Sequence, residues 1–386
     1  MVQNAPMMRL LLGVGFLLGT SSIALAQTSF NITVFGDAFF EAAAVSERND
    51  TGLRTTEFRN RLRVNILPKA KADNGLEYGA RVRIRANDGT RLTDSDRAFL
   101  FANGSFGTVQ LGVVNGATNE MWAGRPIDYH HIYGFYDAPR FWFGSGSTNL
   151  SNPVGTLTDA SDLYANGFAT KAVYYSPRFA GFQFQASYTP RNDSYNTDIN
   201  RTEVNSTSTN WTGNFQDISE VGVNYRNSFD GVAIAAVAGF IAGNAQGNAT
   251  GAAFEKLRGY TAGATIGYAG FKVGGGYTDN GKSGQQQGPG LSHSDFRTWN
   301  AGAQYTAGAW IFGVGFTRGQ DPGSLTVPGD RKNDWYSVGT RYAVAPGLTL
   351  DAEYSYFRYD DDRPATTSAR FDNKGSVYLL RSQLTF

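Results

Sequence analysis

The chain closes on residues 375–386, which read Gly375-Ser376-Val377-Tyr378-Leu379-Leu380-Arg381-Ser382-Gln383-Leu384-Thr385-Phe386. Successive side chains of a β-strand point to opposite faces, so this stretch predicts a strand with one apolar and one polar face. The apolar face carries Tyr378, Leu380, Leu384 and Phe386. The polar face carries Arg381, Gln383 and Thr385. Such a strand suits the edge of a soluble sheet, and it equally suits a barrel in lipid whose polar face lines water.

The same alternation recurs along most of the chain, in segments of about ten residues. The clearest segments are residues 33–41, 57–65, 78–85, 182–188, 220–226, 260–268, 298–305 and 348–356. Their connections alternate between short turns and long loops, which predicts sixteen strands, with fourteen or eighteen as alternatives. An even strand number, with turns on one rim and loops on the other, is typical of an all-β, antiparallel transmembrane β-barrel. The connections argue against a soluble sandwich, whose two sheets would bury their apolar faces against each other.

Two neighbouring segments carry arginines at every second position. They are Arg59, Arg61 and Arg63 in the first segment, and Arg81, Arg83 and Arg85 in the second. A cationic side chain that faces lipid near the middle of the bilayer costs about 2–4 kcal/mol. Three of them would cost about as much as the whole stability of a domain, so we expect all six to face the lumen. That expectation defines which residues of each strand face the lumen, because a shift of the strand by one residue would turn every side chain to the opposite face.

Aromatic pairs flank the predicted short turns, for example Tyr268 with Phe271 and Tyr305 with Trp310. Amphipathic rings favour a membrane–water interface, so these pairs predict an aromatic girdle on the short-turn rim. Ordinary hairpin packing is the alternative explanation for any single pair.

Residues 1–26 carry the pattern of a secretory signal peptide. Arg9 precedes an apolar run over residues 10–18, and Ala24-Leu25-Ala26 supplies a small-x-small cleavage site. We expect cleavage after Ala26 and a barrel domain over residues 27–386, with an N-terminal membrane anchor as the alternative. The chain has no cysteine, which suits an oxidising compartment. Its net charge of +1 gives no indication of a nucleic-acid partner.

The longest predicted loop, residues 115–167, is the candidate functional segment. A barrel of sixteen strands is too wide for its own side chains to fill, so another segment has to narrow the channel. The loop is rich in aromatic residues, which favours packing against the inner wall. Its acidic residues include Glu120, Asp128 and Asp137. Opposite the arginine-rich wall they would set a transverse field that selects ions, and the alternative is that they are solvated loop charges.

Three glycine-containing stretches resemble hairpins of Gram-negative general porins, most closely of the alphaproteobacterial type. They are residues 73–81, 104–112 and 174–182, with the sequences DNGLEYGAR, GSFGTVQLG and YYSPRFAGF. The resemblance covers residues 31–386. It implies a sixteen-stranded barrel in the lipid of the Gram-negative outer membrane, which assembles as a homotrimer with three separate pores.

The resemblance also implies an inward-folded third loop whose acids face the six wall arginines. The candidate acids are Glu120, Asp128 and Asp137. The closing strand is similar to the family's assembly signal, which the barrel-assembly machinery would read from Tyr378, Leu380, Leu384 and Phe386. The loop departs from enteric porins because it is longer and lacks their Pro-Glu-Phe-Gly-Gly motif, so the choice of acids stays open.

We therefore expect an outer-membrane porin, a water-filled channel for passive diffusion of small hydrophilic solutes and ions. We expect no enzymatic activity, no cofactor, no metal and no nucleic-acid partner. His130, His131 and His293 are the chain's histidines, and they lack spaced partners for a metal. The alternatives are a substrate-specific channel for a sugar or an anion, a surface-recognition barrel and an outer-membrane hydrolase. Charges of both signs in the pore allow selectivity for either cations or anions.

Overall fold

The computed structural model describes residues 29–48, 52–86, 92–128, 163, 167–206, 212–249, 251–364 and 372–386. The signal peptide expected over residues 1–26 lies outside the described residues. No helix in these ranges is long and apolar enough to cross a membrane.

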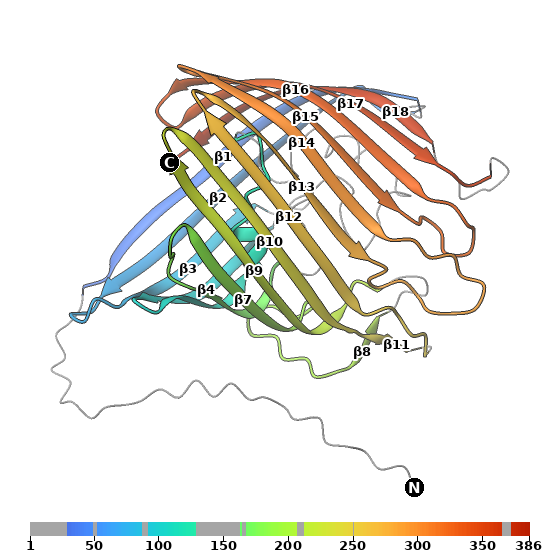
Figure 1. Cartoon of the computed structure of the whole chain (residues 1–386), viewed down its shortest axis with the longest axis horizontal. Coiled ribbons are helices and arrows are strands. Elements are labelled where there is room, and N and C mark those ends of the chain that lie inside the picture. The colour runs from blue at the N-terminus through green and yellow to red at the C-terminus, as the bar shows by residue number, and fades with distance from the viewer. Residues whose placement is uncertain are drawn as a thin grey trace, which may run out of the picture.

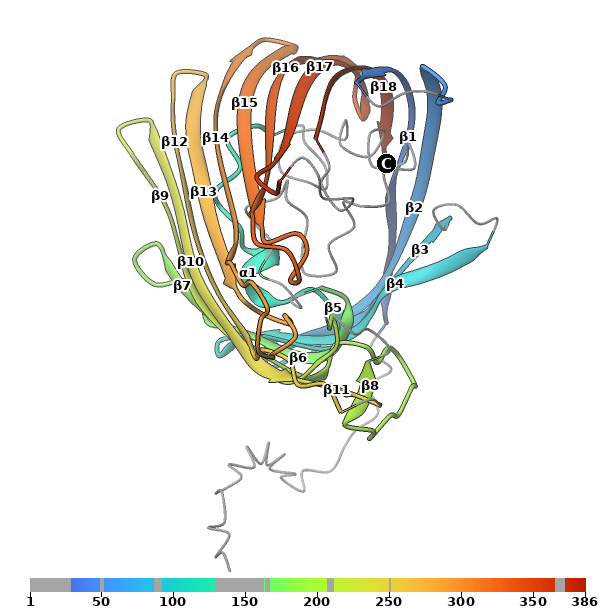
Figure 2. The ribbon, with the colours of Figure 1, turned by 90° about the vertical axis from the view of Figure 1, so that its right-hand side faces the viewer.

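Sixteen antiparallel strands pair in a closed ring, which confirms the predicted barrel (Figure 1). They are β1 (Asn31–Glu47), β2 (Thr56–Lys71), β3 (Glu77–Ala86), β4 (Thr93–Gly104), β5 (Gly107–Val114), β6 (Ala169–Tyr175), β7 (Phe182–Arg191), β9 (Phe215–Phe229), β10 (Val232–Ala245), β12 (Leu257–Tyr268), β13 (Phe271–Gly281), β14 (Phe296–Ala307), β15 (Trp310–Asp321), β16 (Arg331–Ala345), β17 (Leu348–Asp361) and β18 (Asn373–Thr385). Outside this ring, β8 (Val204–Ser206) pairs with β11 (Gly247–Asn248). A single helical turn, α1 (Ala117–Glu120), lies inside the barrel (Figure 2).

The first and last strands close the ring. β1 pairs with β18 in an antiparallel register that places Ala42 opposite Leu380. At the short-turn rim, Gly36 and Phe386 exchange backbone hydrogen bonds of 2.7 and 3.1 Å. Every strand of the ring is therefore paired on both sides, which satisfies backbone groups that lipid cannot satisfy.

Side chains alternate between the outer and inner faces of the barrel. In β18, Tyr378 and Leu380 are 58% and 64% exposed on the outer face. Arg381 and Gln383 are 4% and 8% exposed on the inner face. The apolar face of the strand therefore meets lipid and its polar face lines the interior, as the cost of a charge in lipid requires.

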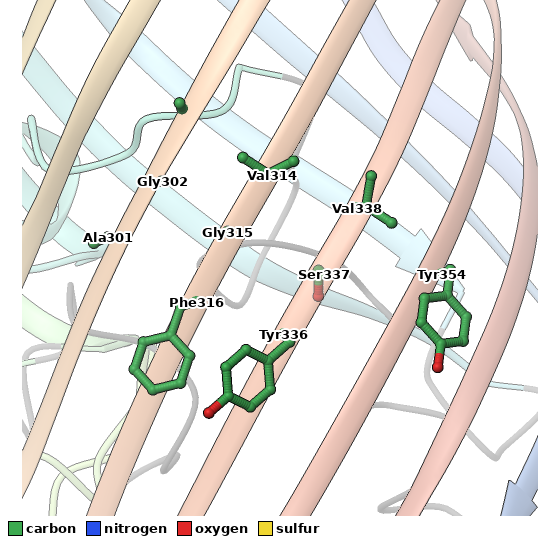
Figure 3. A pocket seen from close by; sticks show the side chains of 10 residues that line it. Ala301, Gly302, Val314, Gly315, Phe316, Tyr336, Ser337, Val338 and Tyr354 are labelled. Carbon is green, nitrogen blue, oxygen red and sulfur yellow. The ribbon is translucent and has the colours of Figure 1, made fainter.

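Aromatic rings form two bands on the outer surface. The predicted band beside the short turns includes Phe271 and Tyr305, whose ring centroids are 4.3 Å apart. A second band lies nearer the long loops, where Phe316, Tyr336 and Tyr354 project from adjacent strands (Figure 3). The ring centroids of Phe316 and Tyr336 are 4.8 Å apart. The sequence analysis missed this band because its members lie within the strands, away from any turn motif.

Candidate functional site

Arginines of β2 line one side of the barrel interior. Arg61 and Arg63 both donate to the carboxylate of Asp37 in β1, over 2.7 and 2.9 Å. A guanidinium nitrogen of Arg59 lies 3.4 Å from a carboxylate oxygen of Glu41. The β1–β2 register places Asp37 opposite Arg63 and Glu41 opposite Arg59. These ion pairs therefore follow from the pairing of the strands.

Arginines of β3 extend the same surface towards β4. Arg83 donates two hydrogen bonds of 2.6 Å to the carboxylate of Asp96. Arg85 donates to Asp94 over 2.8 and 3.2 Å. Two parallel N–H···O bonds to one carboxylate are both stronger and more directional than a single contact. The guanidinium groups are therefore held in defined orientations along the wall.

The charged surface continues across the closure of the ring. Arg381 of β18 lies 2.6 Å from Glu41 and 3.6 Å from Asp351 of β17. Asp351 also accepts two hydrogen bonds, of 2.6 and 2.7 Å, from Arg341 of β16. Ion pairs between basic and acidic side chains thus continue around the inner face from β16 to β4.

Wall carboxylates are the partners of five of the six predicted arginines. Arg81 instead donates to the neutral amide oxygen of Asn65, over 3.0 and 2.8 Å. The sequence analysis expected loop acids here, and the structure places wall acids closer. Side chains paired across neighbouring strands start about 5 Å apart, within direct reach of a guanidinium. We call the six arginines Arg59, Arg61, Arg63, Arg81, Arg83 and Arg85 the basic wall.

The first part of the loop between β5 and β6, residues 115–128, folds into the barrel and follows the side across from the basic wall (Figure 2). Its first turn, α1, contacts β7, β9 and β10. Further along, Asp128 forms an ion pair with Lys272 of β13 and accepts a 2.8 Å hydrogen bond from Gln304 of β14. In the ring order, β9 to β14 lie opposite β1 to β3. The described part of the loop therefore narrows the lumen from the side that faces the arginines.

The three predicted loop acids have different positions. A carboxylate oxygen of Glu120 lies 3.3 Å from Arg97 of β4, beside the basic wall. Asp128 lies on the opposite side, with its side chain 63% exposed. Asp137 lies outside the described residues. Arg97 escaped the sequence analysis because it stands outside the two arginine-rich segments, although it is 6% exposed and faces inward.

Glycines on the inner wall permit the close approach of the loop. A Cβ added at Gly239 of β10 would stand 2.1 Å from Cγ2 of Thr118. One added at Gly276 of β13 would stand 2.4 Å from the ring of Trp122, and one at Gly263 of β12 would stand 2.8 Å from it. Any larger residue at these positions would push the loop away from the wall. Close packing of the loop therefore explains why these positions are glycine, whereas the sequence alone could only place them within strands.

Two buried charged residues anchor the base of the loop. Glu220 of β9 is 1% exposed, and it accepts hydrogen bonds from the hydroxyl of Thr118 and, over 2.8 Å, from its backbone N–H. Lys171 of β6 is 4% exposed, and it donates to the carbonyl oxygens of Gly167 and, over 2.9 Å, Val114. Because Val114 precedes the loop and Gly167 ends it, Lys171 ties the two ends together. Alternation within residues 220–226 assigns Glu220 to a face but does not mark it as an anchor, and Lys171 belongs to no pattern, so neither role was predicted.

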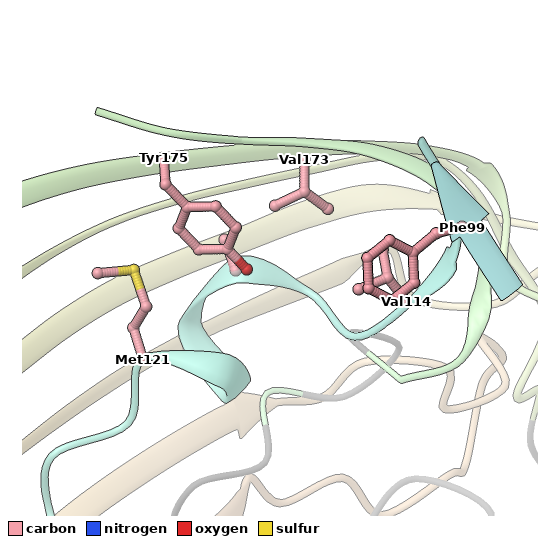
Figure 4. Packing of buried hydrophobic residues seen from close by; sticks show 6 residues of the cluster. Phe99, Val114, Met121, Val173 and Tyr175 are labelled. Atoms are coloured by element: carbon pink, nitrogen blue, oxygen red, sulfur yellow. The ribbon is translucent and has the colours of Figure 1, made fainter. Parts of the chain in front are cut away.

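Apolar packing supports the same base. Six buried residues from β4, β5, the loop and β6 form one cluster (Figure 4). They are Phe99, Val114, Ala117, Met121, Val173 and Tyr175. The cluster holds α1 against the inner wall, so the loop starts from a rigid platform.

The described ranges contain no group of three or more His, Cys, Asp or Glu side chains that could hold a metal ion. His293 contacts the carbonyl oxygen of Gln286 at 2.9 Å. His130 and His131 lie outside the described residues.

An apolar outer surface, a charged interior and a loop folded into the lumen together define a membrane-spanning channel of the outer-membrane type. The chain belongs to the Gram-negative porin family, whose model matches residues 13–362. Family and fold together place the protein in the outer membrane as a porin.

Solved structures share the fold. A loop L8 deletion mutant of OmpT, an outer membrane protein of Vibrio cholerae, superposes with a TM-score of 0.61 at 13% identity, covering 92% of this chain and 99% of that one. The in-vitro folded trimer form of OmpT from Vibrio cholerae superposes with a TM-score of 0.59 at 12% identity, covering 93% of this chain and 100% of that one. A triple mutant of the Rhodopseudomonas blastica porin superposes with a TM-score of 0.53 at 19% identity, covering 92% of this chain and 100% of that one. A search of curated proteins finds no significant match.

Proposed function

We propose that this porin is a water-filled channel for passive diffusion of small hydrophilic solutes and ions. The observation that carries the proposal is the position of residues 121–128, which lie across the lumen from the basic wall. Solutes that cross the barrel pass between these two surfaces. The narrowest point is therefore bounded by arginines on one side and by the loop on the other.

The proposed constriction selects by charge as well as by size. The basic wall forms one side, with Glu120 at its edge beside Arg97, and the loop with Asp128 and Asp137 forms the other side. Charged side chains at close quarters act strongly in a narrow pore with low-dielectric walls. A solute with a large dipole or an unfavourable charge is then slowed relative to a small neutral one.

Charge balance around the constriction favours anions. The arginines on this surface are Arg59, Arg61, Arg63, Arg81, Arg83, Arg85, Arg97, Arg341 and Arg381. The described carboxylates on the same surface are fewer, and they are Asp37, Glu41, Asp94, Asp96, Glu120, Asp351 and Glu353. Lys272 neutralises Asp128 on the far side. This excess of arginine makes an anion-specific channel the second candidate.

The proposed oligomeric state is based on the family and on one solved structure with the same fold. The in-vitro folded OmpT of Vibrio cholerae was solved in a trimer form, and we propose that this porin is a homotrimer too. Residues 1–26 would be removed during export. The barrel-assembly machinery would read the outward-facing residues of the last strand, which are Tyr378, Leu380, Leu384 and Phe386. The pore itself would need neither cofactor nor catalytic residue.

Purified protein in a planar lipid bilayer tests the proposal. We expect ohmic channels, a reversal potential that shows a preference for anions, and no block by sugars. Block by one sugar or anion at submillimolar concentration would instead assign a substrate-specific channel. Failure of folded protein to form any channel would overturn the proposed function.

A further inference from the structure

A polar hollow of ≈ 290 Å³ opens on the barrel where the long-loop ends of β17, β18 and β1 meet. Its lining includes the cationic side chains of Arg48, Arg358 and Lys374, with Tyr356 and Asp360 beside them. We propose that this hollow binds the phosphate of an anionic lipid in the outer leaflet of the outer membrane. The proposal rests on the outer-membrane location of the barrel and is independent of pore selectivity.

Positive charge is concentrated at this hollow. The β17–β18 register pairs Arg358 directly with Lys374, and like charges at paired positions destabilise a sheet. The backbone N–H of Arg48 donates to the carbonyl oxygen of Lys374 over 2.8 Å, which brings a third cation to the same place. Asp360 neutralises one of the three, because it lies 2.7 Å from Arg358. Within the described ranges Arg48 and Lys374 form no ion pair, so the hollow keeps an excess of positive charge.

Two outward-facing cations on the neighbouring strands of this rim have carboxylate partners. Arg318 of β15 donates two hydrogen bonds of 2.6 Å to Asp334 of β16. Lys332 of β16 lies 2.8 Å from Asp362. An anionic ligand in the hollow would offset the repulsion between like charges that the fold leaves there.

The hollow lies at the height of lipid headgroups. Strand β18 rises about 3.3 Å per residue, so Lys374 lies about 40 Å along it from Phe386. With a strand tilt of about 40°, this distance corresponds to a height of about 30 Å, just beyond an apolar band about 25 Å tall. Tyr354 and Tyr378, whose ring centroids are 5.0 Å apart, lie below the hollow on the same lipid-facing surface. Long loops of such barrels are extracellular, so the leaflet is the outer one.

The chemistry of the hollow suits a phosphate. Arg358 can present two parallel N–H donors to phosphate oxygens, and Lys374 adds a compact charge. The hollow opens outward, above a surface where acyl chains would lie against Tyr354 and Tyr378. A carboxylate from a second copy of the chain is the competing occupant, and it would not require that apolar surface below the charges.

Lipid binding can be counted directly by native mass spectrometry of delipidated protein in detergent. The probes are bisphosphorylated lipid A and its dephosphorylated form. We expect the phosphorylated form to bind and the dephosphorylated form to bind far more weakly. The double variant Arg358→Gln, Lys374→Gln should weaken binding about tenfold or more, because charge-assisted hydrogen bonds are lost. The matched control Arg318→Gln, Lys332→Gln removes two charges from paired positions on the same rim and should retain binding.

Several outcomes would overturn the proposal. Equal binding of both lipid forms, or equal binding by both double variants, would show that this hollow does not bind the lipid phosphate. Displacement of the lipid by millimolar inorganic phosphate would assign the site to a free anion. Loss of the oligomer in lipid-free detergent, in the site variant alone, would assign it to a contact between copies. Channel conductance should be the same in both variants, so a failure here leaves the proposed pore function intact.

Discussion

The carboxylate of Glu220 in β9 accepts a 2.8 Å hydrogen bond from the backbone N–H of Thr118, which lies 102 positions earlier in the chain. The hydroxyl of Ser187 in β7 donates to the same carboxylate over 3.0 Å. Thr118 is the second residue of α1, so this contact joins the start of the loop to the wall. This buried carboxylate is therefore one of the contacts that hold the loop in position and thereby set the width of the pore.

We expect Glu220→Ala to raise single-channel conductance and to make the current noisier. The substitution removes the acceptor of the Thr118 N–H, at a cost of about 1–3 kcal/mol for a buried unsatisfied donor, so the loop should leave the wall part of the time. Planar-bilayer recording measures both effects. The control is Ser187→Ala, which keeps the contact between Glu220 and Thr118. Conductance unchanged from the wild type in Glu220→Ala would show that the carboxylate does not hold the loop.

Gly263→Ala should narrow the pore. Its Cβ would stand 2.8 Å from the ring of Trp122 and 2.8 Å from Cα of Gly124, so the loop must shift into the lumen. Overpacking of this kind costs about 1–3 kcal/mol, and we expect both lower conductance and a lower temperature of unfolding. Gly267→Ala on the same face of β12 is the matched control, because its nearest neighbour would lie at an ordinary 3.4 Å. Indistinguishable behaviour of the two variants would contradict the close packing of the loop.

Replacing Arg61 and Arg83 with glutamine should shift ion selectivity towards cations. The substitutions remove two positive charges and leave the carboxylates of Asp37 and Asp96 with fewer donors, so the local potential becomes more negative. The reversal potential in a salt gradient measures the shift. Arg318→Gln removes a charge from the outer surface and should leave the reversal potential unchanged. If the double variant also keeps the wild-type potential, these arginines do not line the constriction.

Phe386→Ala should lower the amount of barrel in the outer membrane without altering the conductance of the channels that form. Phe386 lies on the lipid-facing side, 50% exposed, at the end of the strand that pairs with β1. Quantification of folded protein in membrane fractions, followed by bilayer recording, separates the two effects. Phe271→Ala provides a control on another aromatic of the girdle, which is 60% exposed. A normal yield of Phe386→Ala would refute the proposed role of this residue in assembly.

The sequence by itself determined the barrel, the order of its turns and loops, and the face of each strand that meets lipid. In β18, Leu380 points outward and Arg381 inward, as the alternation predicted. These properties could be predicted because they are local: the period of a strand is two residues, and a cation in lipid costs too much for the opposite register. The number of strands, sixteen rather than fourteen or eighteen, could be decided only from the closed ring in the structure.

Tertiary structure alone decided which acid each arginine meets and which part of the wall the loop follows. Alternation places Arg83 in the lumen and the register pairs it with Arg97, but a bulge in β4 supplies Asp96 as its ionic partner. The contact of Glu220 with Thr118 likewise joins residues that no short-range pattern connects. Local periodicity assigns a side chain to a face, whereas its partner on that face depends on the stagger of the strands after the ring has closed.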